Sequence, residues 1–400
     1  MTGFPLTLVE GIGYKIQVPV AFNASAGETL MPLGNPTAES ALNTLLEVAR
    51  KARAFVSMPV VAGITPRILL DPQHSSPCES TEGIPRRHGV YRLDEIGFPL
   101  LDHSILYGDA CFEGILIKNG RVFLLREHLE RLWRSAGELG IDLPYNRLDL
   151  TRHLLETIRQ VDFEPQDNSY IRLVVSRGLG DLGINPGKCV GSSLFALVST
   201  IRLYPKEAYE RGIPLGIART IRRPGPSILD PRIKSNNYLN NVLALREGCN
   251  GTSHVECVML NQEGFVAEAT VDNIFVVLKQ EGWQTDASKV RVITPSGSFC
   301  LNGITRMTIL RLSRELGYST EESPTLLPLD LVGENREVFM TGTGAFVMPI
   351  TSVAGHRVGD GKPGEVTRIL LGRITETMAE PNCGLEVGAD VDEVRRYLSA

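Results

Sequence analysis

The sequence has no long hydrophobic run and no large excess of one charge. None of its apolar runs approaches the roughly 18 residues that a membrane-spanning helix needs. The start, MTGFPLTLVEGIGYK, lacks the charged segment and the apolar core of a signal peptide. The net charge is −5 over 400 residues. We therefore expect a cytoplasmic protein that contacts neither membrane nor nucleic acid.

Motifs of metal, nucleotide and serine-hydrolase chemistry are also absent. The seven cysteines form no C-x-x-C pair, so reduced thiols are expected. The seven histidines show no metal-ligand spacing, and neither a G-x-S-x-G elbow nor a P-loop occurs. Gly178, Gly180 and Gly183 spell G-x-G-x-x-G, but a turn, Asn185-Pro186-Gly187, follows where a dinucleotide loop would open a helix. The sequence thus predicts no metal and no dinucleotide.

The length of 400 residues favours two domains. Residues 1–88 are rich in Pro, Gly and Ala, contain one helical pattern at Thr37–Val56, and end in a linker-like stretch at 71–87. We therefore expect an N-terminal extension over 1–88, a small α/β domain over 89–200 and a large cofactor-binding domain over 201–400. Within them we predict a hairpin turning at Asn119-Gly120, a helix over 127–140 and one long strand over 265–278.

Lys234 is the first candidate for chemistry. It stands in ILDPRIKSNNYLNNVLALREG, at the mouth of a helix expected to begin near Ser235. A lysine acts on carbonyl compounds when it is neutral, and both burial and the positive end of a helix favour the neutral form. Taken alone, an exposed lysine is the simpler interpretation.

Three other segments carry residues that support a chemical role for Lys234. Glu268 lies among apolar strand residues and would need a partner such as a protonated pyridine, unless it faces water from an edge strand. Ile304 and Thr305 begin an expected helix, where free backbone N–H groups can hold a phosphate or be capped in the ordinary way. Arg131, on the 127–140 helix, could add a charged fork to the same phosphate or lie on the surface.

Seven blocks carry a family resemblance in their order and spacing. They are LDHSILYGDACFEG, FLLREHLERLWRSA, SYIRLVVSRGLGDLGINP, IKSNNYLNNVLA, MLNQEGFVAEATVDNIFVV, NGITRMTILRL and FMTGTGAFVMPITSVAG. Together they resemble class IV aminotransferases, the fold-type IV enzymes that use pyridoxal 5′-phosphate, and most closely the branched-chain amino acid aminotransferases. The resemblance covers about residues 89–370 and implies an α+β fold, with a small α/β domain and a larger barrel-like α+β domain behind the N-terminal extension.

The resemblance also implies roles for individual residues. Lys234 matches the lysine that forms the Schiff base with the cofactor, Glu268 the acid that pairs with the pyridine nitrogen, and Tyr238 the tyrosine at the phenolic oxygen. The positions that match phosphate ligands are Arg131, Ile304, Thr305 and Thr343. Those that match substrate-binding groups are Tyr170, Arg172, Thr343 and Gly344 for the carboxylate, and Phe112 and Tyr204 for the side chain. Tyr107 matches a residue that enters the neighbouring subunit's pocket, which implies a homodimer.

The activity so implied is transamination between a branched-chain L-amino acid and 2-oxoglutarate through a Lys234 aldimine. Three features depart from the family: Leu116 replaces a usual arginine, Ala269 and Val271 replace frequent glycines, and residues 1–88 match nothing. A D-amino acid or (R)-amine transaminase stays open, although its strand usually reads R-x-H instead of the Y-x-R at 170–172. So do an aminodeoxychorismate lyase and a scaffold that has lost catalysis. The linker-like 71–87 stretch predicts that deletion of residues 1–85 leaves cofactor binding intact.

Overall fold

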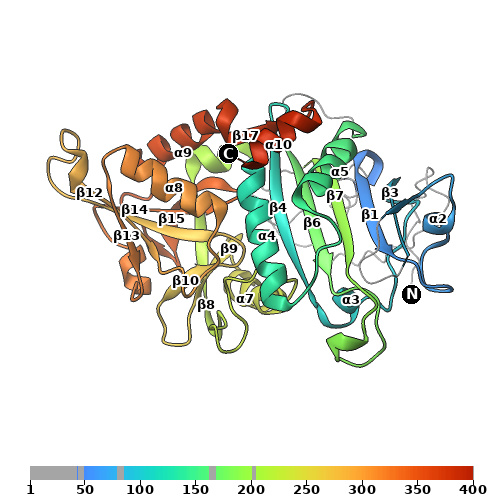
Figure 1. Ribbon diagram of the computed structural model, residues 1–400. Helices are drawn as coiled ribbons and strands as arrows, with labels where there is room; N and C mark the ends of the chain where they lie inside the picture. Colours follow the sequence, from blue (N-terminus) through green and yellow to red (C-terminus); the bar gives the residue numbers. More distant parts are fainter. Residues whose placement is uncertain (1–42, 44–48, 79–84, 162–167, 201–203, 400) are drawn as a thin grey trace, which may run out of the picture. The chain divides into compact units, whose positions relative to one another are not determined.

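The first of two sheets is antiparallel and is built from strands within residues 53–200 together with residues 384–386 near the C-terminus. The structure is a computed structural model that describes residues 43, 49–78, 85–161, 168–200 and 204–399 (Figure 1). Among these residues, eight strands pair in the order β17-β5-β4-β6-β7-β1-β3-β2. Their bounds are β1 Arg53–Pro59, β2 Ser76–Cys78, β3 Arg86–Arg92, β4 Ala110–Lys118, β5 Arg121–Phe123, β6 Ser169–Ser176, β7 Ser193–Thr200 and β17 Gly384–Glu386.

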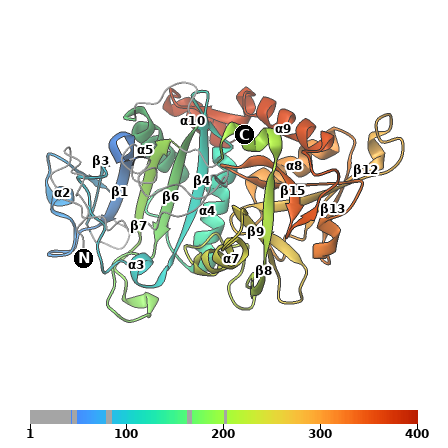
Figure 2. The ribbon, with the colours of Figure 1, turned by 180° about the vertical axis from the view of Figure 1, so that it is seen from behind.

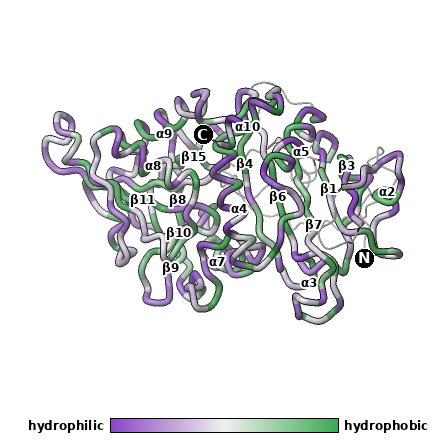
Figure 3. Tube along the Cα trace, in the orientation of Figure 1, coloured by the Kyte–Doolittle hydropathy of each residue, from purple (hydrophilic) through white to green (hydrophobic). Residues whose placement is uncertain are grey.

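Amphipathic helices bury an apolar core against this sheet. The helices of this half are α2 Arg67–Leu70, α3 His103–Tyr107, α4 Leu125–Leu139, α5 Arg147–Arg159 and the C-terminal α10 Val391–Ser399. Hydrophobic and hydrophilic residues alternate along α4 and α5 in Figure 3, and the apolar positions Leu129 and Leu154 are fully buried. Although α10 ends the chain, it packs beside α5, as both ribbon views show (Figures 1 and 2).

The second sheet is mixed and follows the order β10-β9-β8-β15-β14-β11-β12-β13, with β16 paired to β15. Its strands are β8 Ile213–Arg222, β9 Glu256–Leu260, β10 Val266–Ala269, β11 Asn273–Lys279, β12 Val290–Pro295, β13 Ser319–Ser323, β14 Arg336–Gly342, β15 Phe346–Val353 and β16 His356–Arg357. The helices are α6 Lys206–Arg211, α7 Leu239–Cys249, α8 Ile304–Glu315 and α9 Glu365–Thr377. Helix α7 packs on β8 and β9, whereas α8 and α9 pack on β14. The α+β class is confirmed.

Several local predictions are confirmed. The hairpin turns at Asn119-Gly120, with φ of 50° and 72°, which suits Asn and Gly in a tight two-residue turn. Helix α4 ends at Gly140, which adopts a left-handed conformation with φ 63°. A short 3-10 turn, Pro186–Lys188, and no helix follows the G-x-G-x-x-G segment. Within the described ranges, none of the helices combines the length and the hydrophobicity that crossing a bilayer requires.

Two predictions about secondary structure are wrong. Much of the helix expected over Thr37–Val56 lies outside the described residues, and the described residues 43 and 49–51 are helical as predicted, but the last part, from Arg53, is strand β1. Pairing of β1 with β3 and β7 buries Phe55 and overrides the helical pattern. The long strand over 265–278 is broken at residues 270–272 into β10 and β11. That break creates a turn, and the turn carries side chains to the cavity described next.

Strand β1 also bears on the deletion of residues 1–85. The first 88 residues contribute β1, β2 and part of β3 to the antiparallel sheet, and β1 lies in the interior of this sheet between β3 and β7. A chain without residues 1–85 would leave β7 as an unpaired edge and remove the fully buried Phe55 and Met58. We therefore expect a chain without residues 1–85 to be unable to fold.

Candidate active site

A cavity of about 590 Å³ contains most of the predicted site residues. Its walls come from β4, β6, the segment before α7, the β10–β11 turn, the start of α8 and the β14–β15 turn. The predicted residues that line it are Phe112, Arg131, Tyr170, Arg172, Lys234, Tyr238, Ile304, Thr305, Thr343 and Gly344. Residues that are distant in sequence are thus gathered around one space.

Lys234 is held by strand-like pairing and not by a helix. Helix α7 begins at Leu239, so the predicted start near Ser235 is wrong. The backbone N–H of Phe112 donates to the Lys234 carbonyl at 2.9 Å, which ties this segment to β4. The lysine Nζ lies 3.2 Å from the Tyr238 hydroxyl and 4.5 Å from the centre of the Phe112 ring. The amine is therefore half-buried between two aromatic rings with one polar contact.

Arg131 is anchored by a buried carboxylate that sequence reasoning missed. Glu113, on β4, is fully buried and accepts from Arg131 Nε at 2.8 Å and from a second guanidinium nitrogen at 2.7 Å. His128 Nδ1 contacts the same carboxylate at 2.7 Å. Burial alone would raise the pKa of Glu113, but the charge and hydrogen bonds of Arg131, aided by His128, hold it at about 2. The interpretation of Arg131 as a surface residue is wrong, since only 3% of it is exposed.

Burial has a different effect on His128, whose pKa it lowers. The imidazole is therefore neutral near pH 7 and donates a hydrogen bond to Glu113, while Arg131 supplies the compensating charge. The Glu113 position could have been suspected from its place in the F-E-G block beside Phe112. Its partners could not, because they are 15 and 18 residues away on another element.

The first turn of α8 offers free backbone donors to the cavity. Gly303 caps the helix without any side-chain hydrogen bond, and Ile304 and Thr305 line the cavity. The N–H groups of a helix's first turn have no intrahelical acceptor and carry a partial positive charge, so they suit a phosphate. A side chain at position 303 would meet Asn273 Oδ1 at 2.2 Å, so glycine is required there.

Glu268 lies one layer behind the cavity wall. Its strand β10 is an edge strand, as the alternative interpretation held, but Glu268 is only 5% exposed, so it does not face water. Arg223 Nε approaches its carboxylate at 2.7 Å, as a close charge contact without the alignment of a hydrogen bond. The carboxylate also accepts from Asn273 Nδ2 and from the Leu301 N–H, each at 3.1 Å, and both of these residues line the cavity. Sequence reasoning missed Arg223, which stands 45 residues earlier in the chain.

The expected substrate groups fall into two sets. On β6, Tyr170 and Arg172 both line the cavity, and the Arg172 guanidinium lies 4.3 Å from the centre of the Phe112 ring. Tyr107 and Tyr204 are not among the lining residues of this cavity. Tyr107 is 37% exposed on α3, where its hydroxyl bonds the Leu182 carbonyl. Tyr204 instead packs against the apolar core of the second sheet, before α6.

The departures from the family also have defined places. Leu116 is 1% exposed and packs in the core beside the second sheet, away from the cavity lining. Ala269 is fully buried on β10. Val271 lines the cavity and is 57% exposed. Of these three replaced residues, Val271 is the one that lines the cavity.

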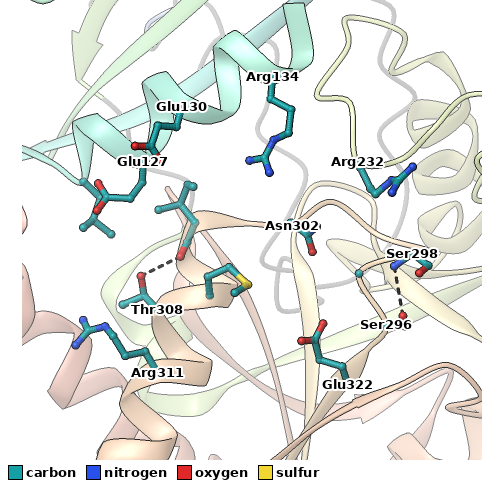
Figure 4. Close-up of a pocket in the computed structure, with 14 residues that line it drawn as sticks. Glu127, Glu130, Arg134, Arg232, Ser296, Ser298, Asn302, Thr308, Arg311 and Glu322 are labelled. Atoms are coloured by element: carbon teal, nitrogen blue, oxygen red, sulfur yellow. Dashed lines mark hydrogen bonds between the residues drawn. The ribbon is translucent and has the colours of Figure 1, made fainter. Parts of the chain in front are cut away.

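A second hollow of about 740 Å³ lies beside the first turn of α8 and shares Ile304 with the cavity (Figure 4). Its side chains come from α4, from Arg232, from the 296–302 segment, from α8 and from Glu322. Arg232, Arg311 and Glu322 are each engaged in an ion pair with a neighbour. Because Lys234 and Tyr238 do not line it, we place the chemistry in the first cavity.

The cavity fits a phosphorylated aromatic aldehyde. Arg131 and the α8 N–H groups can hold the phosphate, Lys234 can react with the aldehyde, and Glu268 lies behind the wall, hydrogen-bonded to the lining residues Asn273 and Leu301. Three lining residues carry buried polar atoms that find no hydrogen-bond partner within the described part of the chain: Asn236 Oδ1, Asp272 Oδ2 and Thr341 Oγ1. Unpaired buried polar atoms are costly, and a polar ligand would satisfy them. Fold and site together define an enzyme of the pyridoxal-phosphate type.

Comparison with known proteins agrees with this assignment. Residues 110–353 match the family model described as amino-transferase class IV. The chain belongs to the class IV aminotransferases: it is an aminotransferase, and its cofactor is pyridoxal 5′-phosphate. The family expectation from the sequence is confirmed.

Individual relatives extend the comparison. A putative branched-chain-amino-acid aminotransferase of Methanocaldococcus jannaschii is 38% identical over 271 residues, which cover 68% of this chain and 88% of the relative. A D-alanine aminotransferase of Bacillus licheniformis is 32% identical over 68% of this chain and 89% of its own length. Among solved structures, the branched-chain amino acid aminotransferase of Escherichia coli has a TM-score of 0.64 at 27% identity, covering 75% of this chain and 97% of that one.

Proposed function

We propose that this aminotransferase works as a homodimer and exchanges the amino group of a branched-chain L-amino acid with 2-oxoglutarate. The observation that carries the proposal is the placing of the Lys234 amine, the Arg131 anion site and the Arg172 guanidinium around one cavity of about 590 Å³. The Arg131 anion site would hold the cofactor phosphate at one end of the cavity, and the Arg172 guanidinium would be left to bind a substrate carboxylate.

The bound cofactor supplies an electron-withdrawing ring that stabilises negative charge at the substrate Cα. Arg131, Thr305 and Thr343 would hold its phosphate, and Glu268 would keep a proton on its ring nitrogen. Lys234 would hold the cofactor through its aldehyde carbon and, as a free amine, would move the proton from the substrate Cα to the cofactor carbon C4′. The Tyr238 hydroxyl, 3.2 Å from Nζ, orients the amine for this transfer.

The cavity walls support an aliphatic substrate with a carboxylate. Phe112, Val174 and Phe195 provide apolar surface, and Arg172 provides charge. Residues 170 and 172 are two positions apart on β6, so their side chains lie on the same face of the sheet, and both line the cavity; the Y-x-R pair can therefore act on one carboxylate. At about 0.8 kcal/mol per buried methylene, such walls separate leucine, isoleucine and valine only modestly.

The second candidate is a D-amino acid transaminase, which the similarity to a D-alanine aminotransferase favours. The two differ in which face of the substrate Cα meets Lys234. The Arg172 guanidinium over Phe112 favours the L-enzyme, because it provides the carboxylate contact that the Y-x-R pair implies.

Exposed apolar side chains support the homodimer. Leu239, Val242 and Leu243 on α7 are 71%, 58% and 40% exposed, and Ile105 beside Tyr107 on α3 is 49% exposed. Apolar residues clustered on a surface commonly mark an interface between proteins. Burial of these two helices against a second copy would place Tyr107 in the interface between the subunits.

The proposed function is tested by adding L-leucine, D-alanine or (R)-1-phenylethylamine to the cofactor-loaded protein and following its visible absorbance. We expect rapid bleaching by L-leucine, with recovery upon addition of 2-oxoglutarate. Lys234→Ala should abolish both, whereas Lys362→Ala, an exposed lysine, should change neither. A response to D-alanine alone would establish the second candidate, and full turnover by Lys234→Ala would contradict both.

A further inference from the structure

Asp272 is a buried carboxyl on the cavity wall that no role above uses. It ends the turn between β10 and β11, is 4% exposed and lines the cavity. A side chain added to Gly342 would meet its Oδ1 at 1.8 Å, so the carboxyl lies directly against Gly342. Gly342 leads into Thr343 and Gly344, whose turn also lines the cavity. Asp272 is thus placed beside the Thr343–Gly344 backbone, which the family resemblance matches to groups that bind the substrate carboxylate.

The carboxyl has no hydrogen-bond partner at Oδ2 among the described residues. Its neighbour Glu256, on β9, is satisfied instead, because its Oε1 accepts from Thr270 and from the Cys257 N–H. An ionised carboxylate that is buried and unpaired is unstable, so Asp272 needs either a proton or a ligand.

The charges around Asp272 favour the proton. The titratable groups near it are Glu256 on β9, Glu268 on β10, Lys234 before α7, Tyr204, and Tyr209 on α6. Burial, and then the negative charge of Glu256, raise the pKa of Asp272 to about 8, although Lys234 opposes them. Near neutral pH the group is therefore a carboxylic acid, whose O–H donates and requires an acceptor.

We propose that Asp272, in its acid form, donates a hydrogen bond to the α-carboxylate of the substrate, next to the Thr343–Gly344 backbone. This inference rests on the proposed function and deepens it by adding a residue to the substrate site. A carboxylate ligand is the required acceptor, whereas the ionised form of Asp272 would repel it. Substrate binding and protonation of Asp272 are therefore linked, and binding weakens as the pH rises through the pKa of Asp272.

The test measures binding without turnover. The probe is 4-methylpentanoate, an acid with the shape of leucine that has no amino group to transfer, titrated calorimetrically into the cofactor-loaded protein between pH 6.5 and 9.5. In the wild type, the dissociation constant should be level below pH 8 and rise toward tenfold per pH unit above it.

Three variants separate Asp272 from other titrating groups. Asp272→Ala should bind the probe roughly tenfold more weakly at pH 6.5, because a hydrogen bond to a charged group is lost, and should show no rise near pH 8. Asp272→Asn keeps a donor and cannot ionise, so it should bind within about threefold of the wild type at pH 6.5 and also lose the rise. Thr341→Val, at another unpaired oxygen of the same wall, is the matched control and should keep the rise.

The inference is wrong if Asp272→Ala binds the probe as tightly as the wild type at pH 6.5, or if Asp272→Asn keeps the pH-dependent rise. Either result would leave the proposed function intact as long as L-leucine still bleaches the wild type. Failure of the wild type to bleach with L-leucine would instead overturn the proposed function, whatever Asp272 does. Near-ultraviolet circular dichroism of each cofactor-loaded variant checks that the fold is kept.

Discussion

Replacing Glu113 by glutamine should damage both the stability of the protein and its hold on the cofactor. Glu113 is fully buried and is the only carboxylate that the described residues offer to the buried side chain of Arg131. Glutamine has nearly the same shape but no charge, and the N–H donors of its amide group would face the N–H donors of Arg131. Arg131 would then keep a buried charge without a counterion.

The magnitude follows from two independent arguments. Removing one partner of a buried ion pair costs about 3–5 kcal/mol. The pKa of Glu113, depressed from 4.5 to about 2, corresponds to about 3 kcal/mol of stability at neutral pH. Because the folded-state pKa is the lower one, this stability is fully present above pH 4.5 and is lost as the pH falls toward 2.

Urea denaturation at pH 7 measures the effect on stability, and equilibrium dialysis measures the dissociation constant of pyridoxal phosphate. We expect Glu113→Gln to lose about 3 kcal/mol of unfolding free energy and to bind the cofactor at least tenfold more weakly, since Arg131 is no longer positioned. Glu138→Gln, at an exposed position on α4, should change stability by less than about 0.5 kcal/mol. A loss below about 1 kcal/mol in Glu113→Gln together with unchanged cofactor affinity would refute the anchoring role.

Three further perturbations test other contacts. Glu268→Gln leaves the buried Arg223 charge unpaired, so it should cost about 3 kcal/mol in denaturation and lower kcat; a stable, fully active variant would contradict this. Burial first, and then the charge of His88, lower the pKa of His153 to about 4. Since histidine in the unfolded chain gains its proton near pH 6.5, the free energy of unfolding should fall between pH 6.5 and 4. His153→Phe should flatten that part of the Tm profile. An unchanged profile would show that other groups cause the fall. Deletion of residues 1–85 should give aggregated protein. Deletion of residues 1–42 should instead give soluble, cofactor-loaded enzyme, because every described strand remains. A cofactor-loaded enzyme from the longer deletion would show that β1 is dispensable.

The site could be predicted residue by residue wherever a short motif carries the chemistry. Lys234, Tyr238 and Thr305 stand in recognisable blocks, and the structure brings all three to one cavity. Tyr204, in contrast, was expected in the cavity but packs against the second sheet. No local pattern around Tyr204 states which way the segment before α6 turns, because that depends on the sheet it covers.

The partners of the site residues were beyond sequence reasoning. Glu113 with Arg131, and Arg223 with Glu268, are pairs between different elements, formed only when the sheets and helices pack. Their strength comes from burial, which no single residue type reveals. Similarly, Asp272 could have been a solvated turn residue, and only the Gly342 backbone lying against its carboxyl shows otherwise.

The sequence by itself determined the local structure that depends on nearest neighbours: the Asn119-Gly120 hairpin, the end of α4 at Gly140 and the start of α8. It also determined the family, because the blocks keep their order and spacing. Tertiary structure decided that the segment at Arg53–Val56 is a strand and that residues 270–272 form a turn. In both places the local pattern was weaker than strand pairing and burial of apolar surface, which depend on residues far away in the chain.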